Sequence, residues 1–125
     1  MQKIKRLPEA EFEVMKAVWS LEPPVSVKQI MERLGTEKKW VAQAVIMLLT
    51  RLAGRGFVRT EKKGRDRIYY PLIAEGDYLK FETDNFLRRY HENSLVNLVS
   101  TLCRDREMDD EDIDGLLEWF KGRKG

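Results

Sequence analysis

The sequence of 125 residues predicts a mainly α-helical protein with one small β-hairpin. Three observations lead to this fold class. Residues 1–72 contain three segments with the apolar spacing of helices, followed by two short β-type segments around a glycine. Residues 73–125 show helical spacing again. The net charge changes sign at the same place. Residues 1–72 carry 15 Lys and Arg against 8 Asp and Glu, whereas residues 73–125 carry 8 against 13.

The first helix is expected at residues 8–21. Its apolar side chains recur at the i, i+3 and i+7 positions of one face, as Phe12, Met15 and Trp19. Pro8 suits the first turn, because a residue there has no N–H partner within the helix to lose.

A capping box indicates the start of the second helix. The Ser26 hydroxyl can accept a hydrogen bond from the backbone N–H of Gln29, whose side chain can reach back to Ser26. Gly35 follows the last apolar residue, at the position of a C-terminal cap.

The third helix is expected after Trp40, with an apolar stripe that consists of Val41, Val45, Leu48, Leu49 and Leu52. Two short strands at residues 57–62 and 67–72 then flank a hairpin tip of sequence Lys63-Gly64-Arg65-Asp66. Three helices followed by a hairpin form the order of a winged helix-turn-helix, and the short 35–39 connection fits its elbow.

The C-terminal part is expected to form three amphipathic helices, at residues 77–90, at 94–103 and from Asp109 onward. About fifty residues are too few to bury a stable hydrophobic core of their own, so we expect oligomerisation. The predicted domains are a winged helix-turn-helix at residues 1–73 and a helical dimerisation domain, or arm, at residues 74–125. The side chains expected between two copies are those of Leu95, Leu98, Val99, Leu102, Ile113, Leu116, Leu117 and Phe120.

Residue types that perform catalysis or bind metals are sparse. The sequence has one histidine, His91, and one cysteine, Cys103, and neither has the spacing of a metal or nucleophile site. We therefore expect no enzymatic activity, no metal and no cofactor. The longest apolar run, at residues 44–49, is far below the roughly 20 residues of a membrane span, so no membrane insertion is expected. No apolar segment follows the basic N-terminus, and a cytoplasmic location is expected.

The cations of the first part lie where a winged helix meets double-stranded DNA. On the outward face of the third helix, Gln43 can pair with adenine, and Met47 can contact only a thymine methyl group. The expected phosphate contacts lie at both ends of this helix and in the hairpin, and they are Lys38, Lys39, Arg51, Arg55, Lys62, Lys63, Arg65 and Arg67.

Several motifs together resemble a known family. They are Glu9–Trp19 in the first helix, Trp40, Leu48-Leu49 and Arg51-Leu52 around the third, Lys63-Gly64-Arg65 and Tyr69 in the hairpin, and Asp77-Tyr78 and Phe86-Leu87 in the arm. In these motifs, from Leu7 to about Phe120, the chain resembles the penicillinase-repressor and methicillin-resistance-repressor family, which also contains copper-responsive repressors.

The resemblance implies a homodimeric transcriptional repressor that binds paired half-sites in a promoter. It also implies release from DNA when a membrane-embedded sensor metalloprotease triggers cleavage in the arm. The bond cleaved in the antibiotic-resistance members joins an Asn to a Phe, and it aligns here with Thr101-Leu102. Because two copies related by a two-fold axis meet two-fold-related DNA, we expect the operator to be an inverted repeat.

The sequence departs from the family pattern in two further places. Gln43-Ala44 and Met47 stand where members often have Lys-Thr and a further Thr, so we expect an operator that differs from the usual one. The copper-responsive branch needs a C-terminal cluster of cysteines, and a chain with Cys103 alone is not expected to be a copper sensor of that kind.

A second class of function also fits the sequence. The alternative is a winged-helix module that binds protein or RNA and does not recognise a specific DNA sequence. Ala44, Ile46 and Met47, on or beside the outward face of the third helix, favour it. Steep weakening of duplex binding with rising salt would distinguish the DNA-binding function from this alternative.

Overall fold

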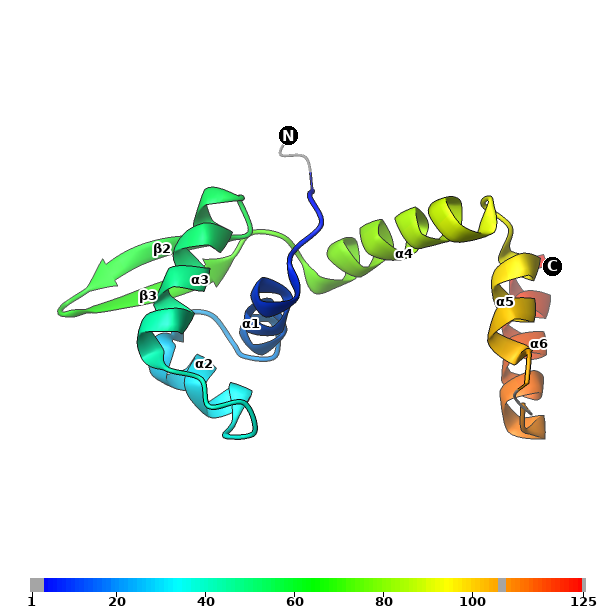
Figure 1. Cartoon of the computed structure of the whole chain (residues 1–125), viewed down its shortest axis with the longest axis horizontal. Coiled ribbons are helices and arrows are strands. Elements are labelled where there is room, and N and C mark those ends of the chain that lie inside the picture. The colour runs from blue at the N-terminus through cyan, green and yellow to red at the C-terminus, as the bar shows by residue number, and fades with distance from the viewer. Residues whose placement is uncertain (1–3, 106–107, 125) are drawn as a thin grey trace. The chain divides into compact units, whose positions relative to one another are not determined.

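The computed structural model describes residues 4–105 and 108–124, which form six helices and a three-stranded antiparallel sheet (Figure 1). In chain order the elements are α1 (Glu9–Trp19), β1 (Val25–Ser26), α2 (Val27–Leu34), α3 (Ala42–Gly54), β2 (Val58–Lys63), β3 (Asp66–Pro71), α4 (Glu75–His91), α5 (Leu95–Cys103) and α6 (Asp110–Lys124). The predicted winged helix-turn-helix, followed by further helices, is confirmed. The chain divides into two units, residues 1–83 and 84–125.

The predicted helix caps are present in the first unit. The backbone N–H of Gln29 donates to Ser26 Oγ at 3.1 Å, and the N–H of Ser26 donates to Gln29 Oε1 at 2.9 Å. This capping box satisfies two donors at the start of α2 that the helix itself leaves unpaired. Gly35 ends α2 with a φ of 77°, a left-handed conformation that glycine adopts without a Cβ penalty.

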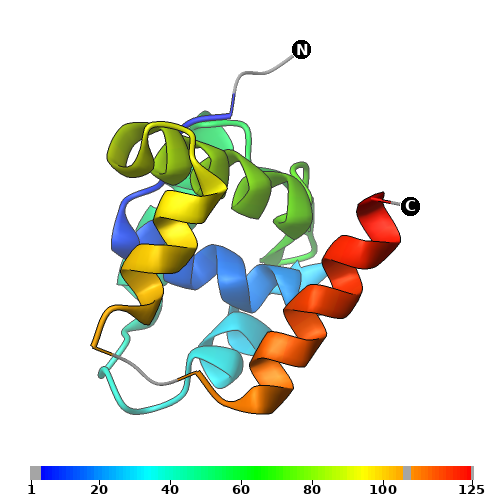
Figure 2. The same ribbon diagram turned by 90° about the vertical axis from the view of Figure 1, so that its right-hand side faces the viewer.

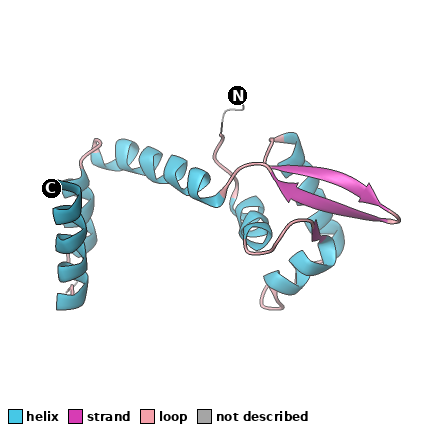
Figure 3. Cartoon of the chain, turned by 180° about the vertical axis from the view of Figure 1, so that it is seen from behind, coloured by secondary structure: helices cyan, strands magenta, loops and turns pink. Residues whose placement is uncertain are grey.

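The predicted hairpin is the wing of the fold, and Figure 3 shows its two strands extending beyond the helices of the first unit. Lys63 pairs with Asp66, so Gly64 and Arg65 form a two-residue turn between β2 and β3. Gly64 has a φ of 64°, which a turn of this length requires and a side chain would strain.

The sheet has a third strand that the sequence did not indicate. Its order is β1-β3-β2, and Val25 and Ser26 of β1 pair with Tyr69 and Ile68 of β3. Two residues are too few for an alternating pattern, which is why β1 was not predicted. Because α2 follows β1 directly, this pairing holds the start of α2 beside the wing.

The core of the first unit lies between α1, α2, α3 and the wing. The stripe on α3 is buried as predicted, except that Val41 precedes the helix and is exposed. The fully buried apolar side chains are those of Val14, Met15, Val18, Val25, Ile30, Val45, Leu49, Leu52 and Phe57.

The first turns of α4 complete this core. Tyr78 is 1% exposed, and its hydroxyl accepts a hydrogen bond from the Leu7 N–H at 2.8 Å. Its ring centroid lies less than 6 Å from those of Phe12, Trp19 and Phe57. The two units therefore meet inside α4, between Thr83 and Asp84, whereas the sequence-based domain boundary precedes that helix.

The second unit exposes most of its side chains. Ser94 caps α5, since its Oγ accepts a hydrogen bond from the Asn97 N–H at 3.0 Å. Among the described residues of α5 and α6 no side chain is buried, and Figure 2 shows the two as separate helices. Within the described ranges, no helix has the length and apolar character needed to cross a bilayer.

Candidate nucleic-acid interface

α3 presents one face to the core and the opposite face to solvent. The inward face is formed by Val45, Leu48, Leu49 and Leu52. Gln43, Met47 and Thr50 lie on the other side and are exposed. The Gln43 amide has no hydrogen-bond partner within the described part of the chain, so its donor and acceptor groups can both engage a base edge.

The cations predicted on the wing are exposed on both strands. Lys62 of β2 and Arg67 of β3 pair directly across the hairpin. Like charges in this position destabilise a hairpin, and an anion placed between them relieves the repulsion. No ion pair with a described carboxylate is formed by any of the four wing cations, which are Lys62, Lys63, Arg65 and Arg67. The unpaired positive charges of the wing therefore favour the binding of a polyanion.

A groove of about 570 Å³ lies between the wing and the helices α2 and α3. Arg65 and Arg67 line it from the wing, Lys28 lines it from the first turn of α2, and Ile46 lines it from α3. Asp66 lies among these cations. Three positive charges against one negative charge, beside the outward face of α3, form a surface to which a phosphate backbone is attracted.

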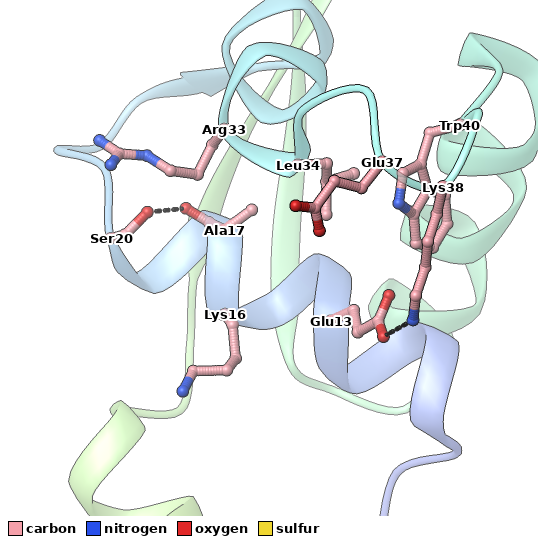
Figure 4. Close-up of a pocket in the computed structure, with 9 residues that line it drawn as sticks. All are labelled: Glu13, Lys16, Ala17, Ser20, Arg33, Leu34, Glu37, Lys38 and Trp40. Carbon is pink, nitrogen blue, oxygen red and sulfur yellow. Dashed lines mark hydrogen bonds and ion pairs between the residues drawn. The ribbon is translucent and has the colours of Figure 1, made fainter.

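Lys38, predicted to contact a phosphate, forms an ion pair with a residue of α1. Its Nζ lies 2.5 Å from Oε1 of Glu13 at the edge of a pocket of about 370 Å³, which Trp40 also lines (Figure 4). The hydrogen bond to the Glu13 carboxylate, together with its charge, raises the pKa of Lys38 above the ordinary lysine value. Lys39, beside it, is exposed and has no carboxylate partner among the described residues.

Arg55, also expected to reach a phosphate, forms an ion pair within the first unit. Its Nε lies 3.2 Å from Oε1 of Glu11, whose side chain is 2% exposed. A buried carboxylate is costly unless a cation pairs with it, so Arg55 stabilises the contact between α1 and α3. Arg51, one turn earlier, remains exposed.

Two further residues line the groove, Lys28, which the sequence did not single out, and Ile46, which the sequence placed beside the outward face of α3. Lys28 belongs to α2 and not to α3, the helix expected to enter the major groove. It lines the groove because β1 holds the start of α2 beside β3. Ile46 lies on the flank of the outward face of α3, toward the wing. The helical spacing in the sequence was enough to place Ile46, whereas the position of Lys28 depends on a strand of two residues.

The predicted residues of the arm are mostly exposed. Leu98 and Val99 are half-buried, and the exposed ones are Leu95, Leu102, Ile113, Leu116, Leu117 and Phe120. Thr101 and Leu102 both lie within α5, and Thr101 Oγ1 donates to the Asn97 carbonyl at 2.9 Å.

His91 is buried, and its Nδ1 lies 2.6 Å from Oδ1 of Asn97. This contact ties the end of α4 to the first turn of α5. Cys103 is half-buried near Met108. Among the residues that the structure describes, no group of three or more His, Cys, Asp or Glu side chains could hold a metal ion.

An exposed outward face on α3, the second helix of a helix-turn-helix, and a basic wing beside it define the winged helix-turn-helix class of DNA-binding folds. Comparison with known proteins places the chain within this class. A family model described as penicillinase repressor matches residues 7–121, and the chain belongs to this family.

Individual relatives agree with this assignment. The chain is 30% identical to the penicillinase repressor of Bacillus licheniformis over 127 aligned positions, which cover 99% of this chain and 98% of that protein. It is 29% identical over 108 positions to the methicillin resistance regulatory protein MecI of Staphylococcus aureus (strain N315), with 86% of each chain covered. The solution structure of the DNA-binding domain of the repressor BlaI matches with a TM-score of 0.52 and 32% identity, over 62% of this chain and 94% of that one. The resemblance noted in the sequence is confirmed.

Proposed function

We propose that this chain is a homodimeric transcriptional repressor that binds an inverted-repeat operator in promoter DNA. The observation that carries the proposal is the groove where Lys28, Arg65 and Arg67 lie beside the outward face of α3. A phosphate backbone neutralises these cations, and Gln43 meets a base edge in the major groove. The similar domain of BlaI is described as a DNA-binding domain of a repressor, which supports DNA as the partner.

Repression by occupation of a promoter requires no chemical step, so we assign the chain no enzymatic activity and no cofactor. The relatives named above are bacterial proteins, and the chromosome of a bacterium lies in the cytoplasm. We therefore expect the repressor to act there.

A second copy of the chain is the proposed partner of the arm. Most of the large apolar side chains of α5 and α6 are exposed in a single chain, and exposed apolar surface of this kind is typical of an interface. Their burial between two copies would stabilise the arm, which is too short to enclose its own core. The two copies then present two winged helices to the two halves of an inverted repeat.

Proteolysis in the arm, triggered by a membrane sensor metalloprotease, is the proposed route to release. The aligned bond joins Thr101 to Leu102 within α5. A protease binds its substrate in an extended form, so the last turn of α5 would have to unwind before cleavage. Such a cut would separate α6 from the rest of the arm and weaken the dimer.

Selection of duplexes from a random pool with the full chain tests the DNA-binding proposal. We expect a recurrent inverted repeat, bound with an affinity whose logarithm falls by about 0.9 per phosphate contact for each tenfold rise in salt. Arg65→Ala should lower this slope by about one, and Lys16→Ala, an exposed cation on α1 outside the groove, should leave it unchanged. A pool that yields no preferred sequence would contradict the proposal.

The exposed Ile46 and Met47 keep one second candidate open, a winged-helix module for protein or RNA. The same groove would then bind a different polyanion or an acidic protein. Tighter binding to structured RNA than to any selected duplex, in the same salt, would favour this candidate over the repressor.

A further inference from the structure

We propose that Ile46 and Met47 together recognise thymine methyl groups, so that each half-site carries thymines opposite this pair. This inference rests on the DNA-binding function proposed above and names the bases that it selects. The pair occupies the part of α3 that, in a winged helix, enters the major groove.

The first observation is exposure without a structural role. Ile46 is 38% exposed and Met47 is 52% exposed, whereas Val45, Leu49 and Leu52 of the same helix are completely buried. The core of the first unit is thus filled without this pair. Two adjacent apolar side chains on the outward face are stabilised by any apolar partner that removes them from water.

The second observation is how few polar groups this face offers. Thr50 Oγ1 donates its proton to the Ile46 carbonyl at 3.0 Å, so it can only accept from a base. Arg51 Nη2 lies 3.9 Å from Met47 Sδ, which draws the guanidinium along the flank of the face. Gln43 remains as the side chain able to donate and accept, and it can specify one base pair. Further selectivity has to come from apolar contact.

The third observation is the charge around the pair, which identifies the partner. Ile46 shares the groove with Lys28, Arg65 and Arg67, and Met47 contacts Arg51. Asp66 offsets one of these four positive charges. An apolar protein surface would leave the cations without partners, whereas the major groove places phosphates around the rim. The apolar group that it presents between them is the C5-methyl group of thymine.

Replacement of thymine by deoxyuridine tests the proposal, because it removes the methyl group and keeps every hydrogen-bonding atom. The probe is the duplex selected from the random pool, with one thymine replaced at a time. Loss of one buried methyl group should weaken binding about fourfold at one or two positions in each half-site, and no other thymine should respond. A 5-methylcytosine–guanine pair at a responding position should bind more tightly than a cytosine–guanine pair, because the methyl group returns.

Substitutions assign the effect to the two side chains. Met47→Ala and Ile46→Ala should each abolish the deoxyuridine response at one position, and Lys16→Ala should retain the whole pattern. Both apolar side chains are exposed, so their truncation leaves the core intact, which thermal unfolding checks.

The outcomes separate this inference from the function on which it rests. If the pool yields a preferred duplex and no thymine responds to deoxyuridine, the inference is wrong and the repressor stands. If the response persists in both alanine variants, other residues recognise the methyl groups and the assignment fails. A pool without any preferred duplex overturns the proposed function itself.

Discussion

Arg51 and Arg55 lie one helical turn apart at the end of α3, and their surroundings differ. Arg51 is exposed beside Met47, whereas Arg55 is bound to the buried carboxylate of Glu11. The sequence places both at the same helix end and so predicted phosphate contacts for both. It did not indicate that Glu11, 44 residues away, is buried against Arg55, because that contact depends on how α1 and α3 pack. The same limit applies to Lys38 and its partner Glu13.

Alanine substitutions should separate the roles of the two arginines. Arg55→Ala should lower the free energy of unfolding by about 2–3 kcal/mol, because Glu11 loses its cation while water reaches it only in part. Arg51→Ala should change stability by less than about 0.5 kcal/mol and lower the salt slope of DNA binding by about 0.9. Urea denaturation and binding titrations measure both effects. Equal stability of the two variants would show that Glu11 does not depend on Arg55.

At the scale of elements, sequence patterns predicted the helices and the wing well, because local signals define them. The capping box at Ser26 and the glycine at the hairpin tip act within a few residues. Patterns did not predict β1, or that the first turns of α4 complete the core of the winged helix. Periodicity identifies a helix and its apolar face, but it does not say which core that face enters.

Tyr78 shows how much α4 contributes to the first unit. Tyr78→Phe keeps the ring and removes the acceptor for the buried Leu7 N–H. We expect a loss of about 1–3 kcal/mol in the free energy of unfolding, measured by urea denaturation. Tyr90→Phe, at an exposed position of the same helix, should change it by less than about 0.5 kcal/mol. If the two variants are equally stable, Tyr78 does not anchor α4 in the way described.

The same side chain predicts a pH dependence. Burial raises the pKa of Tyr78 above its ordinary value, because the phenolate is poorly solvated in the core. The unfolded chain therefore loses this proton first as the pH rises above about 10, and the folded state becomes less stable there. Below that pH the hydroxyl is protonated in both states, so this group does not make the stability depend on pH. The stability difference between wild type and Tyr78→Phe should shrink between pH 8 and 11, and a constant difference would contradict the assignment.

At the scale of the whole molecule, the two units have net charges of opposite sign. They also differ in how many of their apolar side chains are buried. The element order predicted the DNA-binding class, which the family match supports, and the basic groove of the first unit agrees with it. The partner of the arm remains a prediction, because a single chain leaves most of the large apolar residues of α5 and α6 exposed. An interface between copies depends on a second chain, which no local pattern describes in detail.

Leu98→Asp tests the proposed dimer. Burial of an unpaired carboxylate between two copies costs several kcal/mol, so we expect monomers in sedimentation experiments. Ser100→Asp introduces the same charge on α5, at an exposed position outside the apolar stripe, and should remain dimeric. A Leu98→Asp protein that sediments as a dimer would show that α5 does not form the interface.

The most direct test of the account is a change in the spacing of the operator. In a two-fold dimer both copies of α3 enter the major groove on one side of the DNA, about one helical turn or a whole multiple apart. Insertion of about five base pairs, half a turn, between the selected half-sites moves one of them to the opposite side. We predict that binding of the full chain then falls to the level of random duplex and that insertion of a full turn restores part of it. Full affinity after the half-turn insertion would show that the winged helices bind independently and would contradict the dimeric repressor.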